Sequence, residues 1–128
     1  MLNRFEKGYC RDAGTDIILD KDIIFKPHTV TIVDLNIVVT PQNHEMIIVV
    51  PRSGAAAQGL FIANSPVDPD YSGTIHAIVF NASKHKIKYS VGDAFAQLVV
   101  IPFLDFPKDY NVRKLGIRSD GKMGSTNK

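Results

Sequence analysis

The sequence predicts an all-β domain, a distorted jelly roll or β-sandwich with little helix. Three observations predict this class: short apolar runs rich in isoleucine and valine, turn-forming residues between them at near-regular intervals, and no segment with sustained helical periodicity. The chain has 128 residues, of which 45% are hydrophobic and 22% are charged. This size and this composition fit one globular domain with a single core.

The expected strands follow one another along most of the chain. Six of them are unbroken apolar runs, at residues 17–19, 23–25, 37–39, 46–50, 78–80 and 98–101. Two more alternate apolar and polar side chains, as a strand does when one face is buried and the other is wet, at residues 29–33 and 85–89. Turn formers separate these runs at residues 20–22, 41–43, 68–70, 81–83 and 91–93.

Helix is expected only in a run of small residues, 54–58, and for no more than a turn or two. The C-terminal stretch changes character, because residues 105–128 hold six basic and three acidic residues, three glycines and few strand-like runs. We therefore expect a jelly-roll domain at residues 1–112 and a flexible basic tail at residues 113–128.

The charge balance and the single cysteine limit the classes of partner and compartment. The formal net charge is +2 without any block of like charges, so we expect neither nucleic acid nor a membrane as a partner. Cys10 is the only cysteine, which excludes an intrachain disulfide and favours a reducing compartment. No apolar run has the form of a signal peptide or a membrane span. A cytoplasmic protein is expected, or one of the host-cell cytoplasm or nucleus if a virus encodes it.

Four parts of the chain carry side chains suited to a polyphosphate ligand. Residues 51–54 follow a buried-looking strand and offer backbone N–H groups, a hydroxyl and a guanidinium together. Residues 66–73 place two carboxylates and an aromatic ring in a tight turn, where a carboxylate could orient a water beside a sugar. Gln97 lies in an apolar strand and needs a hydrogen-bond partner, for which a ligand phosphate is a candidate. Residues 118–126 form a glycine-containing loop with cationic and hydroxyl groups.

Each of these features taken alone also has a structural explanation, as a solvated turn, an ordinary hairpin or a frayed terminus. The four histidines have no spacing typical of zinc ligands. The chain also lacks a Walker-type loop and a Gly-x-Gly-x-x-Gly turn. A phosphate site in this chain must therefore be of another type.

Taken in chain order, five segments resemble the five motifs of the trimeric dUTPases. They are Ala13-Gly14-Thr15-Asp16; Pro51-Arg52-Ser53-Gly54 with Gly59; Val67-Asp68-Pro69-Asp70-Tyr71-Ser72-Gly73; Gly92-Asp93 with Ala96-Gln97-Leu98; and Arg118 with Gly124-Ser125-Thr126. Their order and their spread over residues 13–126 make chance a poor explanation. The resemblance implies a homotrimer with three active sites between subunits, which uses Mg²⁺ to hydrolyse dUTP to dUMP and pyrophosphate. Such an enzyme supplies dUMP and limits the incorporation of uracil into DNA.

The resemblance also implies roles for single residues. Asp68 would hold and polarise the water that attacks the α-phosphorus in line. Asp16 would hydrogen-bond the waters of Mg²⁺, and Asp93 would support Arg52 in an ion pair behind the phosphates. Tyr71 would lie under the deoxyribose and leave no room for a 2′-hydroxyl. The substrate-binding positions are Arg52, Ser53, Gly54, Asn64, Tyr71, Gln97, Arg118, Met123, Gly124, Ser125 and Thr126, of which the last five lie in the tail that closes over an active site.

The sequence departs from the family pattern at two places that bear on the base. The segment from Asn64 to Asp68 is two residues shorter than the family hairpin that reads uracil. Met123 stands where the family usually has an aromatic ring over the base. Both differences concern the choice of base more than the cleavage chemistry.

Four other functions remain as alternatives. A dCTP deaminase shares the fold and the phosphate site, but it needs a glutamate in the strand after the hairpin, and residues 74–80 contain none. Another dNTP pyrophosphohydrolase of the same superfamily would differ only in the base of its substrate. A nucleotide-binding regulator without catalysis would have no use for Asp68, Tyr71, Gln97 and Arg118 together. A purely structural jelly roll would require none of these residues.

Overall fold

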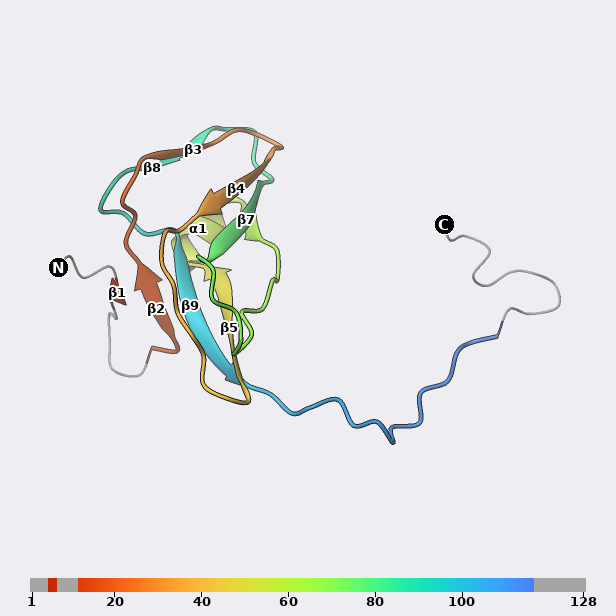
Figure 1. Ribbon diagram of the computed structural model, residues 1–128. Coiled ribbons are helices and arrows are strands. Elements are labelled where there is room, and N and C mark those ends of the chain that lie inside the picture. The colour runs from red at the N-terminus through yellow and green to blue at the C-terminus, as the bar shows by residue number, and fades with distance from the viewer. Residues whose placement is uncertain (1–4, 7–11, 117–128) are drawn as a thin grey trace.

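The computed structural model describes residues 5–6 and 12–116 of the chain (Figure 1). Its strands, in chain order, are β1 (Phe5–Glu6), β2 (Gly14–Ile17), β3 (Ile23–Phe25), β4 (Val30–Asp34), β5 (Glu45–Pro51), β6 (Leu60–Ile62), β7 (His76–Asn81), β8 (Ile87–Tyr89) and β9 (Ala96–Pro102). One helix, α1 (Ser53–Gln58), occurs in this part of the chain. No helix among the described residues is long and apolar enough to cross a membrane. The predicted all-β class with little helix is confirmed.

The strands form three antiparallel groups around one core. In the four-stranded sheet the order is β1, β2, β9, β5; a three-stranded sheet has the order β4, β7, β6; and β3 pairs with β8. Strand β9 is central, because it pairs with β2 on one side and with the whole length of β5 on the other. In Figure 1 the β3–β8 pair lies at the top of the molecule, and β2, β9 and β5 run below it.

Alternation along the strands fills the core from both larger sheets. On β7, for example, Ala77 and Val79 point inward and are fully buried, while their neighbours along the strand point outward. The Phe25 and Phe95 rings meet edge to face with centroids 5.1 Å apart, and the Tyr89 ring packs against both. The core comprises Ile17, Leu19, Ile23, Phe25, Val33, Leu35, Ile37, Ile47, Val49, Ala55, Leu60, Val67, Ile75, Ala77, Val79, Ile87, Phe95, Ala96 and Leu98.

Asn81 is a fully buried polar side chain at the end of β7, and its amide group is completely hydrogen-bonded. Its Nδ2 donates to the carbonyl oxygens of Phe25, at 3.0 Å, and His85, at 2.8 Å. Its Oδ1 accepts hydrogen bonds from both the backbone N–H and the hydroxyl of Ser83. A buried amide is stable only when satisfied in this way, so Asn81 fastens β3 and the 82–86 turn to the end of β7.

Most of the expected strands are confirmed, and residues 23–25 and 54–58 match a strand and the helix closely. The prediction of a strand at residues 37–39 is wrong. Asn36 has a left-handed backbone (φ 56°), and the Leu35 N–H and the Ile37 carbonyl both bond to Ile75, so pairing ends there. Strand β6 was not expected, because three residues after a helix carry little pattern of their own. Gly59, with φ 110°, separates it from α1.

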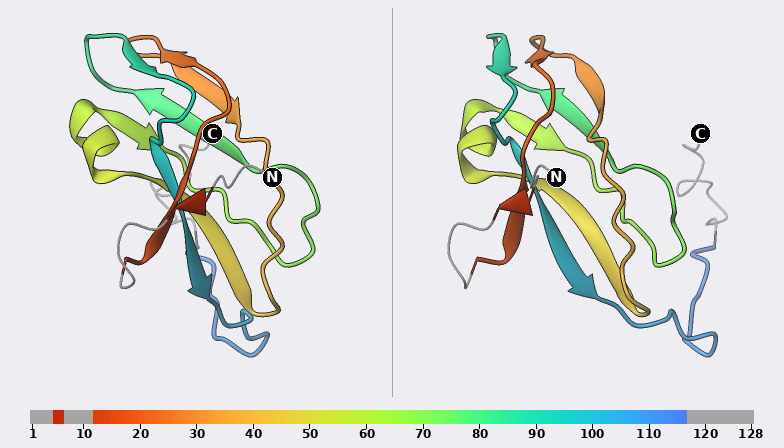
Figure 2. Two further views of the ribbon diagram at one scale, coloured as in Figure 1. Left: turned by 90° about the vertical axis from the view of Figure 1, so that its left-hand side faces the viewer. Right: turned by 60° about the vertical axis from the view of Figure 1, so that its left-hand side comes forward.

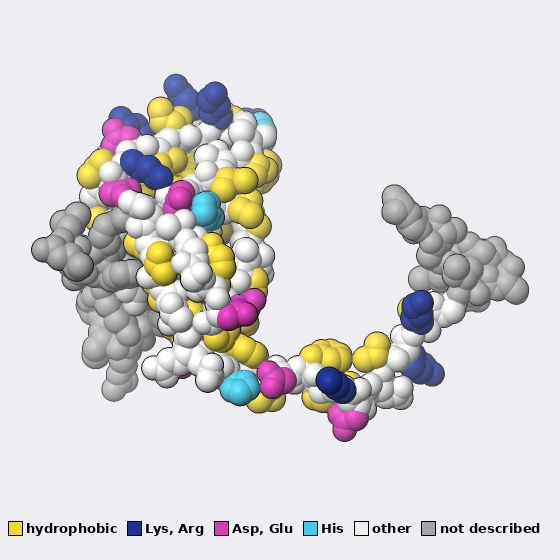
Figure 3. Space-filling view, in the orientation of Figure 1, with side chains coloured by type: hydrophobic (Ala, Val, Ile, Leu, Met, Phe, Trp, Pro, Cys, Tyr) yellow, Lys and Arg dark blue, Asp and Glu magenta, His cyan; other side chains and the backbone are white. Residues whose placement is uncertain are grey.

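The outer face of the β4–β7–β6 sheet carries five large apolar side chains that nothing in the described chain covers. Cross-strand pairing places them side by side, because Ile32 lies opposite Ile78 and Phe80 lies opposite both Val30 and Phe61. Their exposed fractions run from 37% to 66%. Figure 3 shows apolar side chains gathered along this edge of the molecule. We call Val30, Ile32, Phe61, Ile78 and Phe80 the outer face.

After β9 the chain leaves the body of the molecule. Residues 103–116 contain neither helix nor strand and run away from the sheets as an arm (Figure 1). The arm carries Leu104, Phe106, Tyr110, Val112 and Leu115, which are 58% to 91% exposed. The expected division between a domain at 1–112 and a tail at 113–128 stays a prediction, since residues 117–128 lie outside the described chain.

Candidate active site

A cavity of about 430 Å³ gathers predicted site residues from three separate stretches of the chain. Strand β2 supplies Asp16, and β9 supplies Gln97, which lies opposite Asp16 in the sheet register. The turn between β5 and α1 supplies Arg52 and Ser53. We call this the polar cavity, and its complete lining is Asp12, Ala13, Gly14, Asp16, Arg52, Ser53, Gln97 and Val99.

The Arg52 side chain is held in place on one side of the polar cavity. Its Nε lies 3.3 Å from Asp16 Oδ1, and its Nη1 donates to the Ala94 carbonyl at 3.3 Å. Its backbone N–H donates to the Phe95 carbonyl at 2.8 Å. Half of the side chain remains exposed, so a fixed guanidinium faces the solvent of the cavity, where it can bind an anion.

The sequence predicted that Arg52 forms an ion pair with Asp93, and in the described chain the ion-pair partner of Arg52 is Asp16 instead. Arg52 pairs with Asp16, while the Asp93 carboxylate accepts a hydrogen bond from the Ser90 N–H at 2.8 Å and so closes the 90–93 turn. The reason is topological, because β2 lies beside β9 and brings Asp16 to the start of α1. Asp93 and Arg52 still line one further cavity, of about 450 Å³, together with Lys88 and Tyr89.

The predicted partner for Gln97 was a ligand phosphate, and the structure gives it a partner within the protein. Its Nε2 donates to the Pro51 carbonyl at 3.3 Å. This bond anchors the amide beside the β5–α1 turn. The side chain lies over Gly14, because a Cβ built on that glycine would be 2.6 Å from the Gln97 Cδ.

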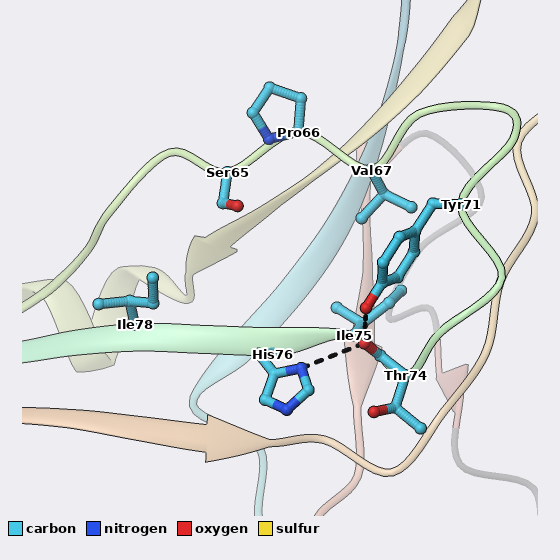
Figure 4. A pocket seen from close by; sticks show the side chains of 8 residues that line it. All are labelled: Ser65, Pro66, Val67, Tyr71, Thr74, Ile75, His76 and Ile78. Atoms are coloured by element: carbon cyan, nitrogen blue, oxygen red, sulfur yellow. Dashed lines mark hydrogen bonds between the residues drawn. The ribbon is translucent and has the colours of Figure 1, made fainter.

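A third, smaller cavity of about 160 Å³ lies between the 63–67 connection and the start of β7 (Figure 4). Its lining is Ser65, Pro66, Val67, Tyr71, Thr74, Ile75, His76 and Ile78. We call it the small cavity. The Tyr71 hydroxyl donates to the Thr74 carbonyl at 2.6 Å, which fixes the direction of the ring across one wall.

Ser65, Thr74 and His76 line the small cavity, and sequence reasoning did not single them out. The available signal was the alternation along residues 76–81, which places His76 and Ile78 on the same outward face as Phe80. Asn64 was predicted to bind substrate. It is exposed just before Ser65, but it is not one of the lining residues.

Asp68 lies in the turn that follows the small cavity, and its side chain is exposed. Its neighbour Val67 is buried and forms a two-way backbone bridge with Ile47 on β5. From Ile47 to Arg52 the chain is extended, and at about 3.3 Å per residue these five steps span about 16 Å. Figure 2 shows α1 and the 63–75 connection on opposite sides of the molecule. One chain therefore does not bring Asp68 to its own polar cavity.

The remaining predicted site residues are placed as follows. Gly54 is exposed in the first turn of α1, next to Ser53. The tail positions Arg118, Met123, Gly124, Ser125 and Thr126 lie outside the described residues.

The donor set around the polar cavity bears on the predicted magnesium ion. In the described part of the chain no three His, Cys, Asp or Glu side chains come together as a metal site. Asp16 lines the cavity with a side chain that is 19% exposed and shares one oxygen with Arg52. Mg²⁺ keeps several waters and is commonly held by one or two carboxylates together with substrate phosphates. These residues fit an ion that arrives with a polyphosphate and reaches Asp16 through water.

Comparisons with protein families and with known proteins agree with one another. The dUTPase family model matches residues 2–127. The chain is 35% identical over 102 residues to a deoxyuridine 5′-triphosphate nucleotidohydrolase of Bifidobacterium longum, an alignment that covers 77% of this chain and 65% of that enzyme. It is 32% identical over 118 residues to the Pol polyprotein of equine infectious anemia virus, covering 90% of this chain and 10% of the polyprotein. The chain thus spans less than two thirds of these relatives' own lengths.

Solved structures of dUTPases share the fold. The native dUTPase of equine infectious anemia virus superposes with a TM-score of 0.73 at 26% identity, over 91% of this chain and 92% of that one. A dUTPase from phage phi11 of Staphylococcus aureus, described with a structural Mg(II) ion, superposes with a TM-score of 0.75 at 18% identity, over 88% and 91%. The predicted jelly roll is confirmed by these neighbours.

Proposed function

The chain belongs to the dUTPase family, and on that basis we propose that it hydrolyses dUTP to dUMP and pyrophosphate. The observation that carries the proposal is the polar cavity, where Asp16, Arg52 and Gln97 come together from three separate stretches of the chain. The small cavity supplies a second half-site, whose lining combines apolar side chains with a few polar ones, as is usual for a small-molecule pocket.

Asp68 is the residue that we assign to the reaction itself. Its carboxylate accepts a hydrogen bond from a water, whose oxygen attacks the α-phosphorus in line with the bridging oxygen to the β-phosphorus. The bond to that bridging oxygen breaks, the proton of the water passes to Asp68, and pyrophosphate leaves. The exposed position of Asp68 beside Tyr71 supports this assignment, because the carboxylate is open to a water and adjoins the nucleoside half-site.

The polar cavity would hold the triphosphate. The Arg52 guanidinium is already oriented by Asp16 and the Ala94 carbonyl, so little side-chain freedom is lost when a phosphate binds. Ser53 and Gln97 add a hydroxyl and an amide to the same cavity, with Gly54 beside them. Mg²⁺, bound with the triphosphate, would neutralise phosphate charge, and Asp16 would hold its waters.

Tyr71 and the C-terminal tail complete the proposed substrate site. The Tyr71 ring, fixed by its bond to the Thr74 carbonyl, would lie under the deoxyribose and exclude a 2′-hydroxyl. Arg118, Ser125 and Thr126 would close over the terminal phosphates, and closure would exclude bulk water from the charged groups.

The separation of the two half-sites supports an assembly in which neighbouring copies share each active site, and we propose a homotrimer. Because about 16 Å of β5 separates the Val67 bridge from Arg52, the Asp68 of one chain must serve the polar cavity of another. The outer face and the arm supply apolar surface for such contacts, since patches of this kind on a monomer mark interaction sites. The number of three copies rests on the resemblance to the trimeric dUTPases.

One experiment tests the proposed function. Purified protein is incubated with Mg²⁺ and each of dUTP, dCTP, dTTP, dATP, dGTP and UTP, and pyrophosphate and ammonia are measured separately. Pyrophosphate release from dUTP alone supports the proposal. Ammonia release from dCTP overturns it in favour of a deaminase, and release of pyrophosphate from another dNTP moves the substrate to that base. Binding of dUTP without any product identifies a regulator instead.

A further inference from the structure

Beside the small cavity, Asp34, Thr74 and His76 form a closed set of polar contacts that also includes the Tyr71 hydroxyl. The Thr74 carbonyl accepts from Tyr71 Oη at 2.6 Å and lies 3.1 Å from His76 Nδ1 (Figure 4). The Thr74 hydroxyl donates to Asp34 Oδ2 at 3.2 Å. His76 Nε2 lies 3.6 Å from the same carboxylate oxygen, which closes the ring of contacts. We call Asp34, Thr74 and His76 the β4–β7 clamp.

Thr74 is therefore held by three contacts, two at its carbonyl from Tyr71 and His76 and one from its hydroxyl to Asp34. A carbonyl oxygen only accepts, so a hydrogen bond at 3.1 Å requires the His76 Nδ1 to carry a hydrogen. Sheet pairing places Asp34 opposite His76, so the carboxylate faces the other side of the ring. The carbonyl that receives the Tyr71 hydroxyl is thus set by the ends of two neighbouring strands.

Asp34 is itself anchored, which makes it a rigid end for the clamp. Its Oδ1 accepts the Asn36 N–H at 2.8 Å, and this hydrogen bond lowers the pKa of Asp34, with smaller contributions from Thr74, His76 and Lys21. Lys21 also donates to the Asp34 backbone carbonyl at 2.6 Å. A fixed carboxylate can hold the protonated His76 ring, which carries a hydrogen on both nitrogens, in one orientation in a way that a freely rotating one cannot.

Gly73 gives independent support to the same arrangement. A Cβ built on Gly73 would lie 2.6 Å from the Tyr71 hydroxyl oxygen and 2.8 Å from the ring carbon that bears it. The tyrosine can reach the Thr74 carbonyl only because Gly73, the residue before Thr74, has no side chain. Gly73 and the Thr74 carbonyl therefore both favour the same position of the Tyr71 ring.

We infer that Asp34 and His76 are positioning residues for the nucleoside half-site, which hold the Tyr71 ring through the Thr74 carbonyl and thereby set the rejection of ribonucleotides. This inference rests on the proposed function and deepens it. Steric rejection of a 2′-hydroxyl requires a ring that cannot retreat, and a ring held only at its Cβ could swing aside at small cost.

The test compares four variants: His76→Leu, which keeps bulk and loses both ring nitrogens; Asp34→Asn, which keeps shape and loses charge; Gly73→Ala; and the conservative Asp34→Glu. The control is His85→Leu, an exposed histidine on the 82–86 turn away from the small cavity. For each variant kcat and KM are measured with dUTP and with UTP, together with the affinities for dUMP and UMP by calorimetry and the melting temperature.

The first three variants are expected to lower the dUTP-to-UTP ratio of kcat/KM about tenfold, through a higher KM for dUTP and a lower KM for UTP. Asp34→Glu should recover part of the ratio, and His85→Leu should leave it unchanged. An unchanged ratio in His76→Leu and Asp34→Asn overturns the inference, as does a parallel loss with both nucleotides. If the unaltered protein does not turn over dUTP, the proposed function fails, and the dUMP-to-UMP affinity ratio still decides the role of the clamp.

Discussion

The Gln97 side chain lies directly over Gly14, on the neighbouring strand of the sheet. A Cβ at position 14 would approach the Gln97 Cδ to 2.6 Å, well inside any normal contact. The bare glycine is what allows the amide to lie flat across β2 and donate to the Pro51 carbonyl at 3.3 Å. Gln97 on β9 therefore has room only because residue 14 on β2 is a glycine. The position of Gln97 in the polar cavity depends on Gly14 and on the Pro51 carbonyl.

Replacing Gly14 with alanine should therefore act through Gln97. We expect Gly14→Ala to displace the amide from Pro51 and raise the KM for dUTP about tenfold, with little change in the free energy of unfolding, because the new Cβ meets only the movable Gln97 side chain. Steady-state kinetics and urea unfolding measure the two effects. Gly116→Ala is the matched control, since a Cβ there meets nothing. If Gly14→Ala has the KM of the unaltered protein, Gln97 does not hold the substrate.

Asp68→Asn should separate chemistry from binding. The amide keeps the size of the carboxylate but cannot accept the proton of the attacking water, so kcat should fall by about 10²–10⁴ while the affinity for dUMP stays nearly the same. Asp70→Asn removes the second carboxylate of the same turn and serves as the control. Turnover by Asp68→Asn at the normal rate would remove Asp68 from its assigned role, and equal losses in both variants would point to the turn itself.

The outer face should prove essential for assembly. Phe80→Glu places a charge at the centre of the apolar patch, where contact with another copy would bury it without a partner. We expect the variant to sediment as a monomer and to lose dUTP turnover, while keeping the circular dichroism spectrum of the folded domain. Ile24→Glu alters an exposed isoleucine of β3 outside this patch and should remain a trimer. A trimeric Phe80→Glu would show that the copies meet elsewhere.

Tyr89 should make the fold sensitive to alkaline pH. Burial raises the pKa of Tyr89 above its ordinary value of 10.0; the charge of Arg52 opposes this shift and that of Asp93 reinforces it. A group with a raised folded-state pKa stabilises the fold fully below its unfolded pKa, and this contribution is lost as pH rises through the folded value. The free energy of unfolding should therefore fall above about pH 10, and fall less in Tyr89→Phe. Parallel curves for the two proteins between pH 9 and 11 would rule out this role.

The strands that could be predicted are those whose apolar runs are bounded by local signals. Residues 23–25 lie between a turn and a proline-containing loop, and they form β3. Residues 37–39 are equally apolar but follow Asn36, whose left-handed backbone turns the chain out of register. Ile37 is buried all the same, and its carbonyl accepts a hydrogen bond from the N–H of Ile75, which is distant in the sequence. The burial of a side chain can thus be predicted from composition more readily than the pairing of its strand.

In the candidate site, too, some residues could be predicted from the sequence and some contacts could not. The motifs identify Asp16, Arg52 and Gln97, but only the β2–β9 register shows that Asp16 is close enough to take Arg52 from Asp93. His76 and Asp34 carry no motif at all. They meet because antiparallel pairing sets the last residue of β4 against the first of β7. Contacts that depend on register are invisible to a scan of local spacing.

The length of β5 has a consequence for inheritance as well as for chemistry. If the Asp68 of each chain serves a neighbour's polar cavity, a chain crippled at Asp68 and a chain crippled at Arg52 carry complementary defects. Mixed trimers of the two chains contain sites where both intact halves meet. Two inactive proteins would therefore regain activity when they assemble together. A gene with one lesion could then be rescued by a second copy with a different lesion, although neither product works by itself.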